Sequence, residues 1–212
     1  MTRPPTPDVV IDLIVEFLDR LDLRDVTLVE SDCGRAQTVA ARHPERLARL
    51  VQISCEALDN YPPGLPGKMI GLACEVPGGV PLLVRTLGMK PLRRLPVGIG
   101  SLTEHPVPDE IVDGWLRPLR TDPAIRRDFR HYNTRIRRSE LFEAAEGLRE
   151  LDKPALVVWA TEDLMMPRAH GGRLAELLPQ GRLVEIEDAW TLIAEDQPER
   201  LASVLREFIA QT

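Results

Sequence analysis

Cysteine is scarce in this 212-residue sequence, which contains only Cys33, Cys55 and Cys74. Three cysteines cannot all pair within one chain, and their spacing is not that of metal ligands. We therefore predict reduced thiols, no disulfide framework and no metal site.

The sequence also lacks any apolar run near the roughly 18–20 residues needed to span a bilayer. Residues 1–7 have no apolar centre of the signal-peptide kind, so the expected location is cytoplasmic.

Positive charge is also in deficit, because 27 lysines and arginines stand against 33 acidic residues, for a net charge of −6. This balance disfavours nucleic acid or a membrane surface as the main partner. We interpret the arginine-rich stretch at 126–138 as the solvated face of a helix rather than a phosphate site. Hydrophobic residues make up 43% of the chain, which is enough for the core of one globular domain.

Short apolar runs rich in β-branched residues predict four strands, at 26–29, 50–54, 154–160 and 182–186. Apolar residues at helical spacing predict helices at 8–21, 36–43, 168–178 and 198–210. A strand, a helix and a second strand at this spacing form a right-handed parallel βαβ unit. The predicted fold class is therefore α/β, with one parallel sheet.

The segment 58–150 has a different character. It is rich in proline and glycine, carries short helical patterns such as 108–116 and 123–138, and has no clear strand pattern. We predict that it is a helical insertion above the carboxyl ends of the strands. The predicted organisation is a first core segment at 1–57, an inserted helical cap at 58–150 and a second core segment at 151–212.

The sharp change from strand to helix around Asp32 and Gly34 resembles the nucleophile elbow of the α/β-hydrolase fold. The phrases Ala40-Ala-Arg-His-Pro-Glu-Arg-Leu47, Ala160-Thr-Glu-Asp163 and Asp196-Gln-Pro-Glu-Arg-Leu201 follow in order. Together these motifs resemble the α/β-hydrolase superfamily, in particular its cap-bearing branch with an aspartate nucleophile. That branch includes haloalkane dehalogenases and epoxide hydrolases.

The resemblance implies a role for each matching residue. Asp32 would be the nucleophile, which attacks an electrophilic carbon and forms an ester that water later hydrolyses. The backbone N–H of Cys33 would be one oxyanion donor, and Asp163 would be the acid that orients the catalytic histidine. The alternative interpretations are structural: Asp32 caps the following helix, and Asp163 is a turn residue at the end of a strand.

The sequence departs from the family pattern at three positions. Thr191 stands where the family places its histidine, and threonine cannot accept a proton near neutral pH. Glu30 occupies a position where the family prefers glycine. Cys33 replaces the usual tryptophan, so no indole N–H is present to hold a leaving halide, and dehalogenation is disfavoured. We interpret the four histidines as structural; they are His43, His105, His131 and His170.

Only one predicted helix precedes the strand 26–29, whereas the family has further strands there, so the chain resembles an N-terminally truncated hydrolase. The unpaired strand is expected to be an exposed apolar edge that promotes self-association. The resulting prediction is an impaired hydrolase of a small apolar ester- or epoxide-like substrate, without a cofactor. The alternatives are a non-catalytic binding protein, a decayed fragment, or a true start of the gene that lies upstream of Met1.

Overall fold

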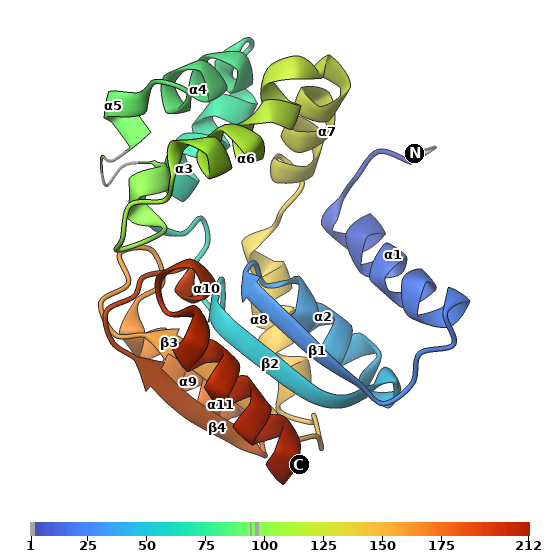
Figure 1. Ribbon diagram of the computed structural model, residues 1–212. Coiled ribbons are helices and arrows are strands. Elements are labelled where there is room, and N and C mark those ends of the chain that lie inside the picture. The colour runs from blue at the N-terminus through green and yellow to red at the C-terminus, as the bar shows by residue number, and fades with distance from the viewer. Residues whose placement is uncertain (1–2, 94, 96–97) are drawn as a thin grey trace.

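The computed structural model describes residues 3–93, 95 and 98–212 of the chain. Its centre is a sheet of four parallel strands in the order β1 (Val26–Asp32), β2 (Leu47–Cys55), β3 (Ala155–Ala160) and β4 (Gly181–Ile186) (Figure 1). The predicted parallel sheet is therefore confirmed, and each predicted strand lies within or overlaps an observed one. No helix in the described part of the chain has the length and apolar character needed to cross a membrane.

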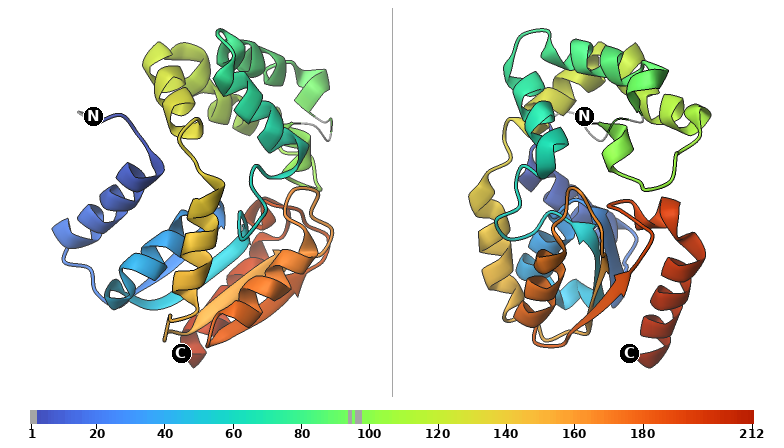
Figure 2. Two further views of the ribbon diagram at one scale, coloured as in Figure 1. Left: turned by 180° about the vertical axis from the view of Figure 1, so that it is seen from behind. Right: turned by 90° about the vertical axis from the view of Figure 1, so that its left-hand side faces the viewer.

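Helices cover both faces of the sheet (Figure 2). One face carries α2 (Arg35–Arg42), α8 (Arg138–Leu148) and α9 (Arg168–Leu177), and the opposite face carries α11 (Pro198–Gln211). The alternation of side chains along β3 explains why this strand is apolar throughout. Leu156 and Val158 pack toward α11, whereas Val157 and Trp159 pack toward α2 and α9. A parallel strand with both faces covered buries every residue, as β3 does.

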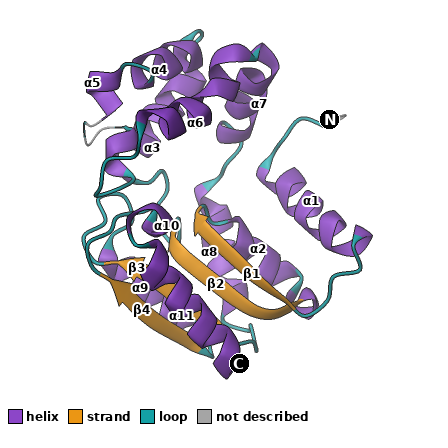
Figure 3. Ribbon diagram, viewed as in Figure 1, coloured by secondary structure: helices purple, strands orange, loops and turns teal. Residues whose placement is uncertain are grey.

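The chain between β2 and α8 forms a separate group of helices above the carboxyl ends of the strands (Figure 3). We call this group the helical layer. It consists of α3 (Gly64–Glu75), α4 (Gly79–Leu87), α5 (Lys90–Arg93), α6 (Asp109–Thr121) and α7 (Pro123–Asn133), with the short helix η2 (Ile99–Ser101). Its own small core is made of Cys74, Val80 and Val84, with Ile70, Leu119 and Phe129 packed against them. No described residue of this layer belongs to a strand.

Helix α8 lies within the range expected for the insertion, yet it packs with the sheet rather than with the helical layer. Its buried residues Leu141, Ala144, Ala145 and Leu148 recur at helical spacing and face α2. A Cβ on Gly147 would lie 2.6 Å from the Cβ of Ala41, so the two helices approach closely at this glycine. The segment 58–150 therefore contributes to both the helical layer and the body of the molecule.

Strand β1 is at the edge of the sheet and pairs with β2 alone among the described strands. Helix α1 (Pro7–Arg20) packs on α2 and is joined to it by an ion pair between Asp8 and Arg42 at 2.9 Å. The outer main chain of β1 has no strand partner in this structure, and Val29 on it is 44% exposed. An apolar, unpaired edge is a site at which a second chain can add a strand.

We expect the protein to self-associate through this edge, with a weight-average mass that rises with concentration in sedimentation velocity. The variant Val29→Lys should remain monomeric over the same range, because a lysine on an edge strand disfavours strand addition. Ile209→Lys is the matched control, since Ile209 is similarly exposed, at 45%, but lies on α11. A wild-type protein that is monomeric at every concentration would contradict this expectation.

Candidate functional site

The turn that joins β1 to α2 places Asp32 in an unusual conformation. Its φ angle is +70°, in the left-handed region that non-glycine residues rarely adopt. The backbone N–H of Cys33 donates a hydrogen bond to the carbonyl oxygen of Ser31 at 2.8 Å, which closes a tight turn around Asp32. Strain of about 1–3 kcal/mol at such a position is typical of active sites and ligand-binding sites. The N–H of Cys33, which the resemblance assigns to an oxyanion, is therefore already bonded in this structure.

Glu30 has a clear structural role at the position where the family resemblance suggested glycine. Its two carboxylate oxygens accept hydrogen bonds from the backbone N–H groups of Arg35, at 2.6 Å, and Ala36, at 2.8 Å. N–H groups in the first turn of a helix such as α2 have no acceptor within the helix, and Gly34 before them has no side chain that could serve as a cap. Burial raises the pKa of Glu30 to about 8. Glu30 thus holds the beginning of α2 against the end of β1.

Gly34 is required by the close approach of two other segments. A Cβ at this position would lie 2.6 Å from a methyl carbon of Leu141 on α8 and 2.8 Å from the carbonyl oxygen of Glu56. Both distances are shorter than van der Waals contact allows. The glycine therefore lets β1, the end of β2 and α8 meet directly beneath Asp32.

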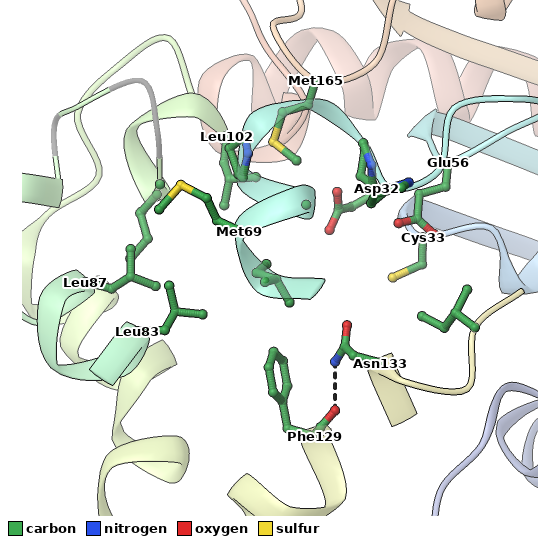
Figure 4. Close-up of a pocket in the computed structure, with 18 of the residues that line it drawn as sticks. Asp32, Cys33, Glu56, Met69, Leu83, Leu87, Leu102, Phe129, Asn133 and Met165 are labelled. Carbon is green, nitrogen blue, oxygen red and sulfur yellow. Dashed lines mark hydrogen bonds between the residues drawn. The ribbon is translucent and has the colours of Figure 1, made fainter. Parts of the chain in front are cut away.

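A cavity of about 460 Å³ lies between the turn and the helical layer. Its sheet side is formed by Asp32, Cys33 and Glu56, whose side chains point into it (Figure 4). The opposite walls come from α3, α4, α6 and α7 and are mainly apolar; they include Ile70, Leu83, Leu87, Leu116, Leu119 and Phe129. No lysine, arginine or histidine is among the described residues that line it. A cavity of this size and character suits a small apolar molecule.

The structure brings Asp163 and Thr191 together, as the resemblance predicts for the acid and the residue in the place of the histidine. The Thr191 hydroxyl donates a hydrogen bond to Asp163 Oδ1 at 2.8 Å. The same oxygen accepts the backbone N–H groups of Met165, at 2.8 Å, and Met166, at 2.9 Å. Burial raises the pKa of Asp163 despite these bonds. Thr191 is fully buried, so its hydroxyl is held on Asp163.

Asp32 is close enough to Asp163 to experience its charge. Burial, and secondarily the negative charge of Asp163, raises the pKa of Asp32 above its ordinary value. Asp32 lines the cavity, whereas Asp163 and Thr191 are not among its lining residues. The predicted Asp32 and Asp163 therefore lie at the same edge of the sheet, with Asp32 as the residue that faces the cavity.

The four histidines are not among the residues that line the cavity. His170 contacts Asp59 at 3.1 Å, His105 lies 3.4 Å from Asp196, and His43 lies 3.8 Å from Glu45. His131 is in the last turn of α7. Within the described residues, no group of three or more histidine, cysteine, aspartate or glutamate side chains is arranged to hold a metal ion.

Glu56 is a residue of the site that the sequence did not single out. It follows β2 directly, and its backbone N–H donates to the carbonyl oxygen of Asp32 at 2.9 Å. Its carboxylate lies 3.7 Å from the guanidinium of Arg35, which is itself 5% exposed and also contacts Glu140 at 3.3 Å. Burial raises the pKa of Glu56 to about 7; Arg35 opposes this shift and Asp32 adds to it. The sequence signal for Glu56 is an acidic residue directly after β2, the strand that pairs with the one that ends at Asp32.

Removal of the Glu30 cap should destabilise the protein. We expect Glu30→Ala to lower the free energy of unfolding by about 1–3 kcal/mol, because two buried backbone N–H groups lose their acceptor. Urea unfolding followed by circular dichroism at pH 7 measures this change. Glu176→Ala is the control, since Glu176 is an exposed glutamate on α9. Equal stability of the Glu30 and Glu176 variants would show that the cap contributes nothing.

Stability should also fall as pH rises from about 4.5 to 8. Glu30 and Glu56 have an ordinary pKa of 4.5 and folded pKa values of about 8 and about 7. Between these limits the folded state holds protons that the unfolded chain has lost, so a rise in pH favours unfolding. Urea unfolding at a series of pH values measures the fall, and Glu56→Gln should make it shallower. A free energy of unfolding that rises across this interval would contradict the assignment.

No family model matches the chain. The "Uncharacterized hydrolase YugF" of Bacillus subtilis (strain 168) is 30% identical to it over 103 residues. The matched segment covers 49% of this chain but 36% of that relative, which is little more than a third of its length. This similarity is to a hydrolase, and it is restricted to half of the chain.

Solved structures match over nearly all of the chain, at low sequence identity. An α/β hydrolase fold protein from Burkholderia ambifaria has a TM-score of 0.75 at 19% identity, over 94% of this chain and 72% of that one. A serine hydrolase from Cycloclasticus zankles has a TM-score of 0.77 at 15% identity, over 99% of this chain and 74% of that one. A meta-cleavage product hydrolase, CumD, from Pseudomonas fluorescens IP01 has a TM-score of 0.74 at 18% identity, over 99% and 73%. With its parallel sheet and its helical layer, the chain therefore has the fold of the α/β hydrolases.

Proposed function

We propose that the protein binds a small apolar molecule in the cavity above Asp32 and that the Asp32 carboxylate attacks an electrophilic carbon of it. The observation that carries this proposal is the position of Asp32, at φ +70° on the sheet side of an apolar cavity of about 460 Å³. A strained turn that presents one nucleophilic side chain to a cavity is the arrangement of a nucleophile elbow. The similarity to a hydrolase and the α/β-hydrolase fold support hydrolysis as the overall reaction.

Epoxides, and ester-like compounds with an equally electrophilic carbon, are the proposed substrates. With an epoxide, one oxygen of Asp32 forms a bond to a ring carbon, and the bond between that carbon and the ring oxygen breaks. The ring oxygen keeps the electron pair and takes a proton, for which the phenols of Tyr61 and Tyr132 are donors in the cavity wall. The product of this step is an ester on Asp32 with a free hydroxyl group on the substrate.

The second step, hydrolysis of the ester, is the impaired one in this proposal. Thr191 occupies the place of the histidine, is bonded to Asp163 and has no basic nitrogen that could activate water. The N–H of Cys33 is bonded to Ser31 and must be released before it can stabilise an oxyanion. These two observations also favour the second candidate function, in which the protein binds its ligand without chemistry.

A covalent adduct on Asp32 is the expected outcome of incubation with styrene oxide, a small apolar epoxide. Intact-mass spectrometry should detect the addition of one epoxide, and peptide mapping should place it on Asp32. The variant Asp32→Asn should form no adduct, whereas Cys33→Ala should still form it, which excludes alkylation of the neighbouring thiol. Binding of the epoxide to the wild-type protein with neither an adduct nor a diol formed would favour the non-catalytic function instead.

A further inference from the structure

We propose that Glu56 is the proton acceptor that activates water for hydrolysis of the ester on Asp32. The inference rests on the proposed function, because it concerns the second step of that reaction. Glu56 is the only other carboxylate among the described residues that line the cavity, and it enters from the strand next to Asp32. Glu56 would act as the general base, a role for which Thr191 has no suitable group.

The backbone fixes the proximity of the two carboxylates. Asp32 pairs with Cys55 in the ladder between β1 and β2, so Glu56 is the next residue along the neighbouring strand. The hydrogen bond from Glu56 N–H to the Asp32 carbonyl oxygen, at 2.9 Å, ties the two main chains together beyond the last ladder pair. Both side chains then leave adjacent backbone positions toward the same cavity (Figure 4). A water molecule between an ester on Asp32 and Glu56 would be within reach of both.

The surroundings of Glu56 suit a base that works near neutral pH. Burial raises its pKa to about 7, and the buried guanidinium of Arg35 lies 3.7 Å from its carboxylate. The titratable groups that influence it or are influenced by it are Glu30, Asp32, Cys33, Arg35, Cys55, Tyr61 and Tyr132. Esterification removes the charge of Asp32, which lowers the pKa of Glu56 and favours its ionised form at pH 7.

Water and Glu56 together hydrolyse the ester in this proposal. The oxygen of water attacks Cγ of the Asp32 ester while a Glu56 oxygen takes one proton from that water. The bond between Cγ and the substrate oxygen then breaks, and the leaving oxygen takes the proton back from Glu56. Asp32 is left as a carboxylic acid with one oxygen from water, and it releases its proton, which replaces the one that the phenol gave to the ring oxygen in the first step. The products are a diol, when the substrate is an epoxide, and the original carboxylates of Asp32 and Glu56.

A pulse of styrene oxide on the full-length protein, followed by removal of the free epoxide, tests this role. The adduct on Asp32 should clear from the wild type and should clear about 100-fold more slowly from Glu56→Gln, since general-base catalysis contributes at least this factor. Clearance in the wild type should rise with pH up to the pKa that Glu56 has beside the Asp32 ester, which is lower than in the free protein, whereas the variant should show a flat pH profile. In water enriched in ¹⁸O, one labelled oxygen should appear in Asp32 of the wild type.

Two controls separate this role from a loss of structure. Glu56→Gln must still form the adduct on Asp32, which reports an intact cavity, and Glu176→Gln on the surface of α9 should clear it normally. Formation of the adduct with equal clearance in the wild type and Glu56→Gln, whether rapid or absent, would overturn the role of Glu56 and leave Asp32 as the nucleophile. Absence of both adduct and diol from every protein would overturn the nucleophile itself and the role of Glu56 with it.

Discussion

The buried guanidinium of Arg35 is the cation around which the carboxyl edge of the sheet is organised. The backbone N–H of Arg35 donates to Glu30 on β1, and the guanidinium contacts Glu56 after β2 and Glu140 on α8. One residue therefore connects two strands and two helices beneath the cavity. Loss of one partner from a buried ion pair costs about 3–5 kcal/mol, because the remaining charge stays without compensation. The position of Asp32 depends on this arrangement, since the turn that carries it lies between these contacts.

The burial of the carboxylates around Arg35 has a consequence for their chemistry. Glu30, Asp32 and Glu56 all have raised pKa values, and burial is the main cause in each case. A desolvated carboxylate is less stable in its charged form and is therefore a better nucleophile or base than one in water. For Asp32 and Glu56, which line the cavity, the apolar helical layer contributes to this burial with leucine, isoleucine and phenylalanine side chains. The helical layer that would bind a ligand thus also helps to raise the pKa values of Asp32 and Glu56, the two carboxylates that would act on the ligand.

Much of the fold was predictable from local patterns. The apolar runs at 26–29 and 154–160 predicted strands because short runs rich in β-branched residues favour a buried strand, and proline and glycine marked the segment above the sheet. The layer to which α8 belongs was not predictable, because an apolar stripe such as Leu141, Ala144 and Leu148 reveals a buried face but not its partner. Glu30 was also unpredictable as a cap. Its role exists only once the chain reverses and brings the N–H groups of Arg35 and Ala36 back to it.

The sequence by itself determined the order of strands and helices along the chain, the turn at Asp32 and the presence of threonine at 191, where the family resemblance leads one to expect histidine. These features are local: they depend on side-chain periodicity, on glycine at 34 and on the identity of single residues. Only the tertiary structure decided which carboxylates share a cavity. Asp32 and Glu56 are far apart in the chain, but Asp32 ends β1 and Glu56 directly follows the neighbouring strand β2, while Asp163 and Thr191 pair with each other outside the cavity lining. Burial and charge proximity set the pKa of each group, and both arise only when the sheet and the helical layer come together.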